Sequence, residues 1–229
     1  RDLHSFPTRR SSDLEPVREL FAGGRATATL MLWVIFLCTL MMFYFMISWL
    51  PTILTNAGAP VGSAIMAALF LNAGSVLGGI LLARYVDRKG SVGILVFNYV
   101  GAALSYVLVG VVGSNLIVVG ALVFCAGFFV GGGQLVANAL ASTYYPTSMR
   151  STGVGWAFGA GRVGSLAGPV IGGVLLAAQL DHAALFLIAA IPALFAAIAA
   201  FVLARETGRS AANAPFAPVS AAQKDAIPS

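Results

Sequence analysis

The chain has 229 residues, of which 59% are hydrophobic and only 9% are charged, and its mean hydropathy is +0.91. These values exclude an ordinary soluble domain and indicate a membrane protein. The net charge of +5 comes from short clusters between long uncharged segments. The basic residues are therefore expected to set membrane topology, and nucleic acid is not an expected partner.

Residues 1–14, RDLHSFPTRRSSDL, form a polar segment that lacks the central apolar run of a signal peptide. The segment resembles a forward translation of a common sequencing-adapter oligonucleotide. We therefore expect residues 1–14 to be a gene-assembly artefact, and we expect the chain to be a fragment whose natural sequence extends upstream of Glu15. Residues 15–26 are predicted to be a cytoplasmic linker.

Six apolar segments follow, each about 20 residues or longer and so able to cross a bilayer as an α-helix. Their predicted limits are 27–50, 62–83, 92–112, 116–140, 152–178 and 183–204. The sequence thus predicts an all-α membrane protein with a six-helix transmembrane bundle over residues 27–204. Residues 205–229 are rich in Ala, Pro and Ser and are predicted to form a disordered cytoplasmic tail.

The basic residues that flank these spans all fall on one side of the predicted bundle, and the opposite loops contain no Lys or Arg. They are Arg18, Arg25, Arg84, Arg88, Lys89, Arg150, Arg205, Arg209 and Lys224. The positive-inside rule then predicts that both ends of the fragment lie in the cytoplasm. The expected location is the cell inner membrane, as a multi-pass protein.

One arginine, Arg162, stands inside the fifth span, in the stretch GWAFGAGRVGSLAGPVIGG of residues 155–173. It lies roughly 15 Å beyond Thr152, near the midplane of the hydrocarbon layer. An unpaired guanidinium at that depth costs at least about 3 kcal/mol, so it should face a cavity or a partner. Gly164, Gly168 and Gly172 recur every four residues and predict a close-packing helix face, and Pro169 predicts a kink.

Two interpretations of Arg162 remain open. In the first, it is a structural residue that bonds carbonyl groups of a neighbouring helix. In the second, it is a fixed positive site for an anionic ligand, because a guanidinium binds a carboxylate with two parallel hydrogen bonds. The second is preferred because no Asp or Glu occurs inside any of the six predicted spans.

Three stretches carry a family resemblance: GGILLARYVDRKG at 78–90, SWLPTILTNAG at 48–58 and YYPTSMRSTGVGWAFGAGRVGSLAGPVIGG at 144–173. The first resembles the cytoplasmic loop motif of the major facilitator superfamily, although Ala83 and the pair Ser91-Val92 depart from that motif. The others, with the position of the arginine, resemble the aromatic acid:proton symporters. The resemblance spans about residues 17–205. It implies the C-terminal six-helix bundle of a twelve-helix fold, in which Asp87 and Arg88 would form a gating loop.

The resemblance also implies that spans one, two, four and five line a central cavity. The expected substrate-binding residues on these spans are Arg162, Tyr44, Asn72, Phe128, Gln134 and Trp156. Together they would supply a cation, amide and hydroxyl groups, and aromatic faces for a flat ring with a carboxylate. The alternatives are an interhelical hydrogen bond for Asn72 and simple packing for Phe128.

The resemblance thus implies a transporter that imports aromatic or related organic carboxylates with protons. The expected partners are a small organic anion, protons, the lipid bilayer and a missing N-terminal six-helix half that holds the proton acceptor. No enzyme activity, metal or cofactor is expected, because the sequence lacks catalytic spacings and has only two Cys and two His. The alternatives are a facilitator that imports another metabolite, an efflux protein, and a non-transporting membrane scaffold.

Overall fold

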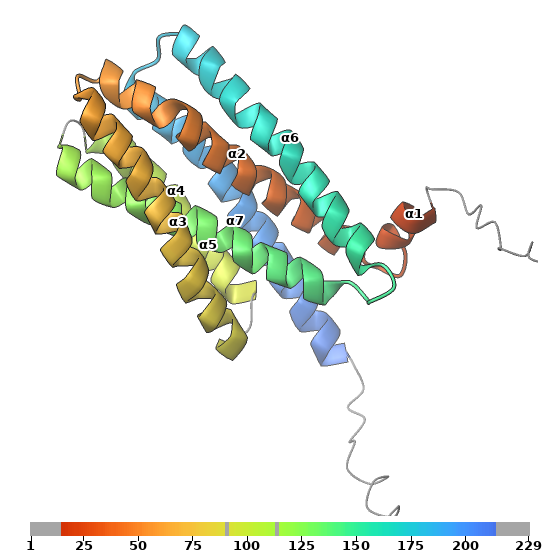
Figure 1. The fold of residues 1–229 in the computed structure, drawn as a ribbon. Coiled ribbons are helices and arrows are strands. Elements are labelled where there is room, and N and C mark those ends of the chain that lie inside the picture. The colour runs from red at the N-terminus through yellow and green to blue at the C-terminus, as the bar shows by residue number, and fades with distance from the viewer. Residues whose placement is uncertain (1–14, 90–91, 113–114, 214–229) are drawn as a thin grey trace, which may run out of the picture.

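Seven α-helices make up the computed structural model, which describes residues 15–89, 92–112 and 115–213 (Figure 1). In chain order they are α1 (Glu15–Phe21), α2 (Ala26–Asn56), α3 (Val61–Lys89), α4 (Val92–Val111), α5 (Leu116–Tyr144), α6 (Arg150–Ala177) and α7 (His182–Asn213). Six of the helices in the described part of the chain are long and apolar enough to cross a membrane. The predicted all-α, six-span architecture is therefore confirmed.

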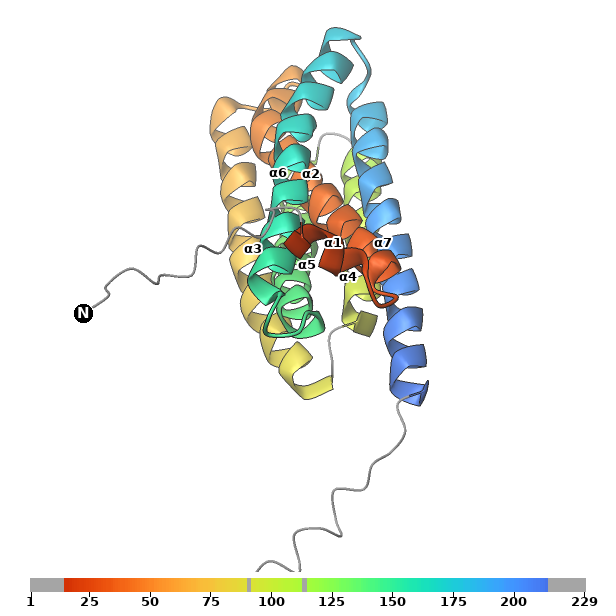
Figure 2. The same ribbon diagram turned by 90° about the vertical axis from the view of Figure 1, so that its right-hand side faces the viewer.

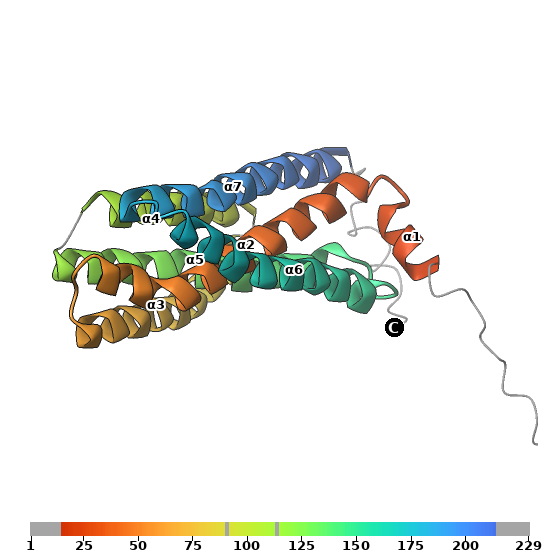
Figure 3. The same cartoon turned by 90° about the horizontal axis from the view of Figure 1, so that it is seen from above.

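The six long helices lie in three layers (Figure 3). α4 and α7 pack together as one outer layer, α2 and α5 form the middle, and α3 and α6 form the other outer layer. Seen from the side, α3 and α7 lie at opposite edges of the bundle (Figure 2). The helices α2–α4 and α5–α7 form two interlocked units, because α3 packs mainly on α5 and α6 packs mainly on α2.

Glycines allow α6 to lie directly on the backbone of α2. Gly164 and Gly168 are buried, and a Cβ atom on either would overlap the carbonyl oxygen of Leu37 or Met41, respectively. A Cβ on Gly172 would overlap the indole ring of Trp49. The predicted glycine packing face is therefore confirmed, and its partner is α2.

Glycines also allow α3 and α5 to pack backbone against backbone, and here both helices contribute them. A Cβ on Gly74 or Gly78 would overlap carbonyl oxygens of α5, and a Cβ on Gly127 would overlap the carbonyl oxygen of Leu71 in α3. Because neither helix has side chains at these points, the two backbones approach closely. These glycines are packing surfaces within helices.

Buried hydroxyl groups tie the middle layer to its neighbours. The Thr39 hydroxyl donates to the Ile35 carbonyl oxygen at 2.6 Å and lies 2.7 Å from the hydroxyl of Tyr99 in α4. Tyr106, also in α4, donates to the carbonyl oxygen of Met42 at 3.0 Å. Each bond satisfies a polar group that would otherwise be costly in an apolar core.

Several predicted boundaries differ from the observed ones. α2 continues through Pro51 to Asn56, where a loop was expected, and α3 continues past residue 83 to Lys89. The expected linker 15–26 contains α1, and α7 extends through residues 205–213, where a disordered tail was expected. Helix α6 is continuous through Pro169. Residues 1–14 and 214–229 lie outside the described part of the chain.

Candidate substrate site

A cavity of about 310 Å³ lies between α2, α3 and α5. It is lined by Thr39, Leu40 and Phe43 of α2, Ser75 and Val76 of α3, and Val130, Gly131, Gln134 and Leu135 of α5. Gly131 is needed here because a Cβ atom at this position would overlap the Ser75 hydroxyl. The cavity thus combines the Phe43 ring, aliphatic walls and three polar side chains in the middle of the membrane spans. Small-molecule sites commonly show this combination.

The polar side chains of this cavity differ in how far their hydrogen bonds are satisfied. The Thr39 hydroxyl is buried and already engaged with Ile35 and Tyr99. The Gln134 amide nitrogen donates to Asn138 Oδ1 at 2.9 Å, but the Gln134 Oε1 atom is buried and has no donor in the described part of the chain. The site therefore holds one unpaired acceptor.

Arg162 lies on α6 and is exposed on a side of that helix away from the glycine face. Phe158, one turn earlier, packs edge to face on Phe36 of α2 with ring centroids 5.1 Å apart. Within the described residues the Arg162 guanidinium has no ion-pair or hydrogen-bond partner, and only its carbonyl oxygen accepts a bond, from the Ser165 hydroxyl. A cation at this depth is thus left available to a ligand or another helix.

Tyr44 and Asn72 lie beside the cavity without lining it. The Tyr44 ring packs edge to face on the cavity residue Phe43, with centroids 6.1 Å apart. Asn72 is exposed, donates to the Ala68 carbonyl oxygen at 2.8 Å and lies one turn before Ser75. Both residues therefore border the same region as Gln134, although only Gln134 among the expected binding residues lines the cavity itself.

Phe128 and Trp156 lie elsewhere. The Phe128 ring packs edge to face on Phe129, which in turn packs on Phe97 of α4, so the Phe128 ring lies beside the contact between α4 and α5. Trp156 stacks on Trp33 of α2 with centroids 5.7 Å apart and planes at 17°. Trp33 also packs on Phe21, so Trp156 belongs to an aromatic group beside α1. The side chains of Asp87 and Arg88 lie outside the described residues.

Sequence reasoning missed Thr39, Phe43 and Ser75 as cavity residues. Thr39 and Ser75 each stand in an apolar run without a distinctive spacing, and Phe43 is one of three consecutive aromatic residues. The available signal was the small hydroxyl side chains of Thr39 and Ser75 in the middle of spans that also contain Tyr44 and Asn72. Among the described residues, no three His, Cys, Asp or Glu side chains gather in the way that a metal site requires.

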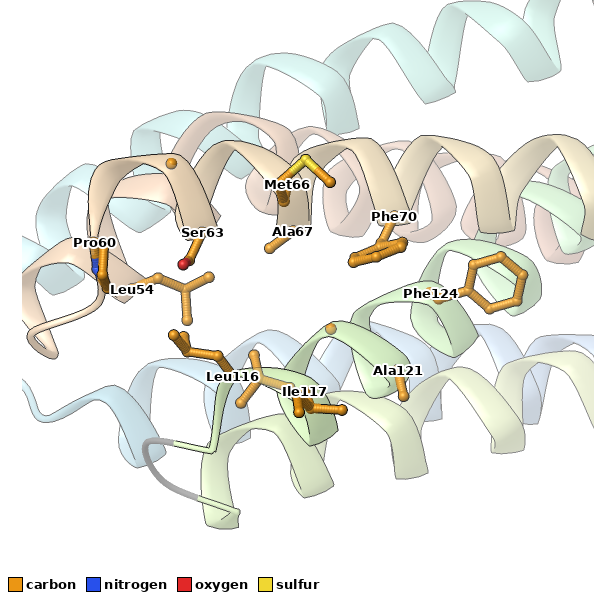
Figure 4. A pocket seen from close by; sticks show the side chains of 13 residues that line it. Leu54, Pro60, Ser63, Met66, Ala67, Phe70, Leu116, Ile117, Ala121 and Phe124 are labelled. Carbon is orange, nitrogen blue, oxygen red and sulfur yellow. The ribbon is translucent and has the colours of Figure 1, made fainter.

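A larger cavity of about 790 Å³ lies where the first turns of α3 and α5 separate (Figure 4). Its walls are almost entirely apolar, with Met66, Phe70 and Phe124 among them, and Ser63 is the polar side chain at its edge. It offers no charge or hydrogen-bonding set that would fix an organic anion. The smaller cavity beside Gln134 is therefore the better candidate site.

Comparison with known proteins identifies the family of the chain. The family model described as Major Facilitator Superfamily matches residues 32–227. The chain is 36% identical over 186 residues to the gallate transporter of Pseudomonas putida, covering 80% of this chain and 41% of that protein. It is 35% identical over 196 residues to the 3-(3-hydroxy-phenyl)propionate transporter of Escherichia coli, covering 85% of this chain and 48% of that protein.

A further relative is the benzoate transport protein of Acinetobacter baylyi, 35% identical over 192 residues, covering 82% of this chain and 40% of that protein. The chain thus spans less than half the length of these relatives. The match to the family model covers most of the chain, including the cavity and Arg162. With its six apolar helices, the chain belongs to the major facilitator superfamily.

Proposed function

We propose that this chain is the C-terminal half of a secondary transporter that imports aromatic carboxylates together with protons across the cell inner membrane. The names of three relatives, which refer to gallate, a hydroxyphenyl propionate and benzoate, support an aromatic acid as substrate. The chain's coverage of less than half of each relative supports its role as one half of the transporter. The six apolar helices and the family match support a multi-pass membrane transporter rather than an enzyme.

The observation on which the proposal chiefly rests is the exposed cation of Arg162 within an apolar helix. Its guanidinium suits a carboxylate, because the two groups form two parallel charge-assisted hydrogen bonds. The cavity beside Gln134 adds the Phe43 ring and an amide, which suit the flat ring of an aromatic acid. Tyr44 and Asn72 border this cavity and complete the proposed binding surface.

Proton coupling requires a group that changes its charge during transport. No Asp or Glu lies in the interior of the six apolar spans, so we assign the proton acceptor to the N-terminal half. The distribution of Lys and Arg supports a cytoplasmic location for both ends of this chain. Asp87 and Arg88 would then latch the cytoplasmic ends of neighbouring helices in one state of the transport cycle, and Phe128 and Trp156 would act through packing.

The test is uptake of labelled aromatic acids by the complete transporter in proteoliposomes, with a proton gradient imposed across the membrane. We expect concentrative uptake that a protonophore abolishes and that unlabelled aromatic acids inhibit. A sugar acid of similar charge should inhibit weakly, because it lacks a ring for the aromatic wall. Inhibition by the sugar acid alone, or export driven by the same gradient, would contradict the proposal.

A further inference from the structure

The amide oxygen of Gln134 is an unusual feature of the candidate site. It is buried and has no hydrogen-bond donor among the described residues, whereas the amide nitrogen of the same side chain donates to Asn138 Oδ1. Native structures leave few buried acceptors unpaired, and such groups often mark functional positions. A donor supplied by a ligand would satisfy this oxygen.

The neighbouring polar groups limit the kind of ligand that could supply this donor. The Thr39 hydroxyl already donates to Ile35 and pairs with Tyr99, so it has no donor to offer. Across the cavity, the Ser75 hydroxyl forms no hydrogen bond within the described part of the chain and lies against Gly131. The cavity wall therefore contains the Gln134 side chain, whose unpaired oxygen is covered, and one free hydroxyl at Ser75, beside the Phe43 ring.

We propose that Gln134 and Ser75 recognise a hydroxyl group on the ring of the substrate, so that the transporter selects ring-hydroxylated aromatic acids over unsubstituted ones. The substrate hydroxyl donates to Gln134 Oε1 and accepts from the Ser75 hydroxyl. The proposal requires a turn about the terminal torsion of Gln134, which is soft in glutamine, to expose the covered oxygen to the cavity. This inference rests on the proposed function and adds the determinant of substrate choice.

A site built to bond a substrate hydroxyl rejects analogues that lack it, because its own polar group then stays unpaired. For one neutral hydrogen bond we expect a preference of about tenfold. A methyl ether at the same ring position should lose this preference, because the ether accepts a hydrogen bond but donates none. The ether therefore separates donation to Gln134 from the mere size of the substituent.

The experiment measures competition for uptake by the complete transporter in proteoliposomes. The competitors are the ortho, meta and para hydroxybenzoates, their methoxy counterparts and benzoate. We expect the wild type to prefer at least one hydroxybenzoate about tenfold over both its ether and benzoate. Gln134→Met, which keeps the length of the side chain without its polar atoms, should reduce this ratio to near one. Leu122→Met, a change on α5 outside the cavity, should keep the wild-type ratio.

Three outcomes would overturn the inference. An unchanged ratio in Gln134→Met would show that the amide does not recognise the hydroxyl, and equal competition by ethers and hydroxybenzoates would exclude donation by the substrate. If Gln134→Met fails to assemble, Ser75→Ala tests the preference for the hydroxybenzoate over benzoate, because benzoate has no ring oxygen that could accept from Ser75. A wild-type preference over benzoate in Ser75→Ala is again contrary. If the wild type transports no aromatic acid, the proposed function itself fails. If the wild type transports aromatic acids and the variant keeps the same preference, only this inference fails.

Discussion

The indole nitrogen of Trp49 donates a 2.8 Å hydrogen bond to the carbonyl oxygen of Pro169, and this bond links α2 to α6. The ring lies against Gly172, where any Cβ atom would overlap it. The contact therefore fixes the two helices next to the proline, which cannot donate a backbone hydrogen bond within α6. Because α6 also holds Arg162, this contact helps to position the proposed carboxylate site.

Trp49→Phe should lower the free energy of unfolding by about 0.5–1.5 kcal/mol, since it removes one hydrogen bond and keeps an aromatic ring. The measurement is denaturation of the purified complete transporter in detergent. Trp33→Phe is the matched control, because the Trp33 indole nitrogen is buried without a partner among the described residues. Equal losses in the two variants would contradict a specific role for the bond to Pro169.

Gly164→Ala should destabilise the bundle by about 1–3 kcal/mol, because the new methyl group would overlap the Leu37 carbonyl oxygen and force α6 away from α2. Gly93→Ala provides the contrast, since nothing lies within 4 Å of a Cβ atom there. That change should be neutral or should stabilise α4 by up to about 1 kcal/mol. Equal shifts of the denaturation midpoint in the two variants would contradict close backbone packing at Gly164.

A double-mutant cycle tests the link between Thr39 and Tyr99. Thr39→Val leaves the Tyr99 hydroxyl buried without its partner and should cost about 1–3 kcal/mol. Tyr99→Phe should cost less, because Thr39 keeps its bond to the Ile35 carbonyl oxygen. In the double variant much of the loss should be recovered, and strictly additive losses would argue against a direct bond.

Hydropathy and helix signals predicted most of the bundle. The span from Leu116 begins at the predicted residue, where Asn115 caps the helix by accepting a 3.4 Å hydrogen bond from the Val118 amide. The end of α2 was placed too early, because Pro51 suggested a break. In the structure this proline stays within a helix that is anchored on both sides of it by buried Leu50 and Ile53.

The candidate site was harder to predict, for a geometric reason. A helix in this bundle has several neighbours, and the sequence does not say which side faces which neighbour. Phe128 and Gln134 both lie on α5, yet the Phe128 ring packs on Phe129 and the Gln134 side chain lines the cavity. The partners of Thr39 and Ser75 come from other helices, so their roles depend on long-range packing.

The measurement that tests the central claim most directly is equilibrium binding of a labelled aromatic acid to the purified complete transporter and to its Arg162→Gln variant. Removing a charged hydrogen-bonding partner should weaken binding by about 1.5–3 kcal/mol, or roughly tenfold to more than a hundredfold. The corresponding carboxamide should compete poorly with the acid in the wild type, because it carries no charge. If a correctly folded Arg162→Gln variant binds the acid with wild-type affinity, Arg162 is not the carboxylate site.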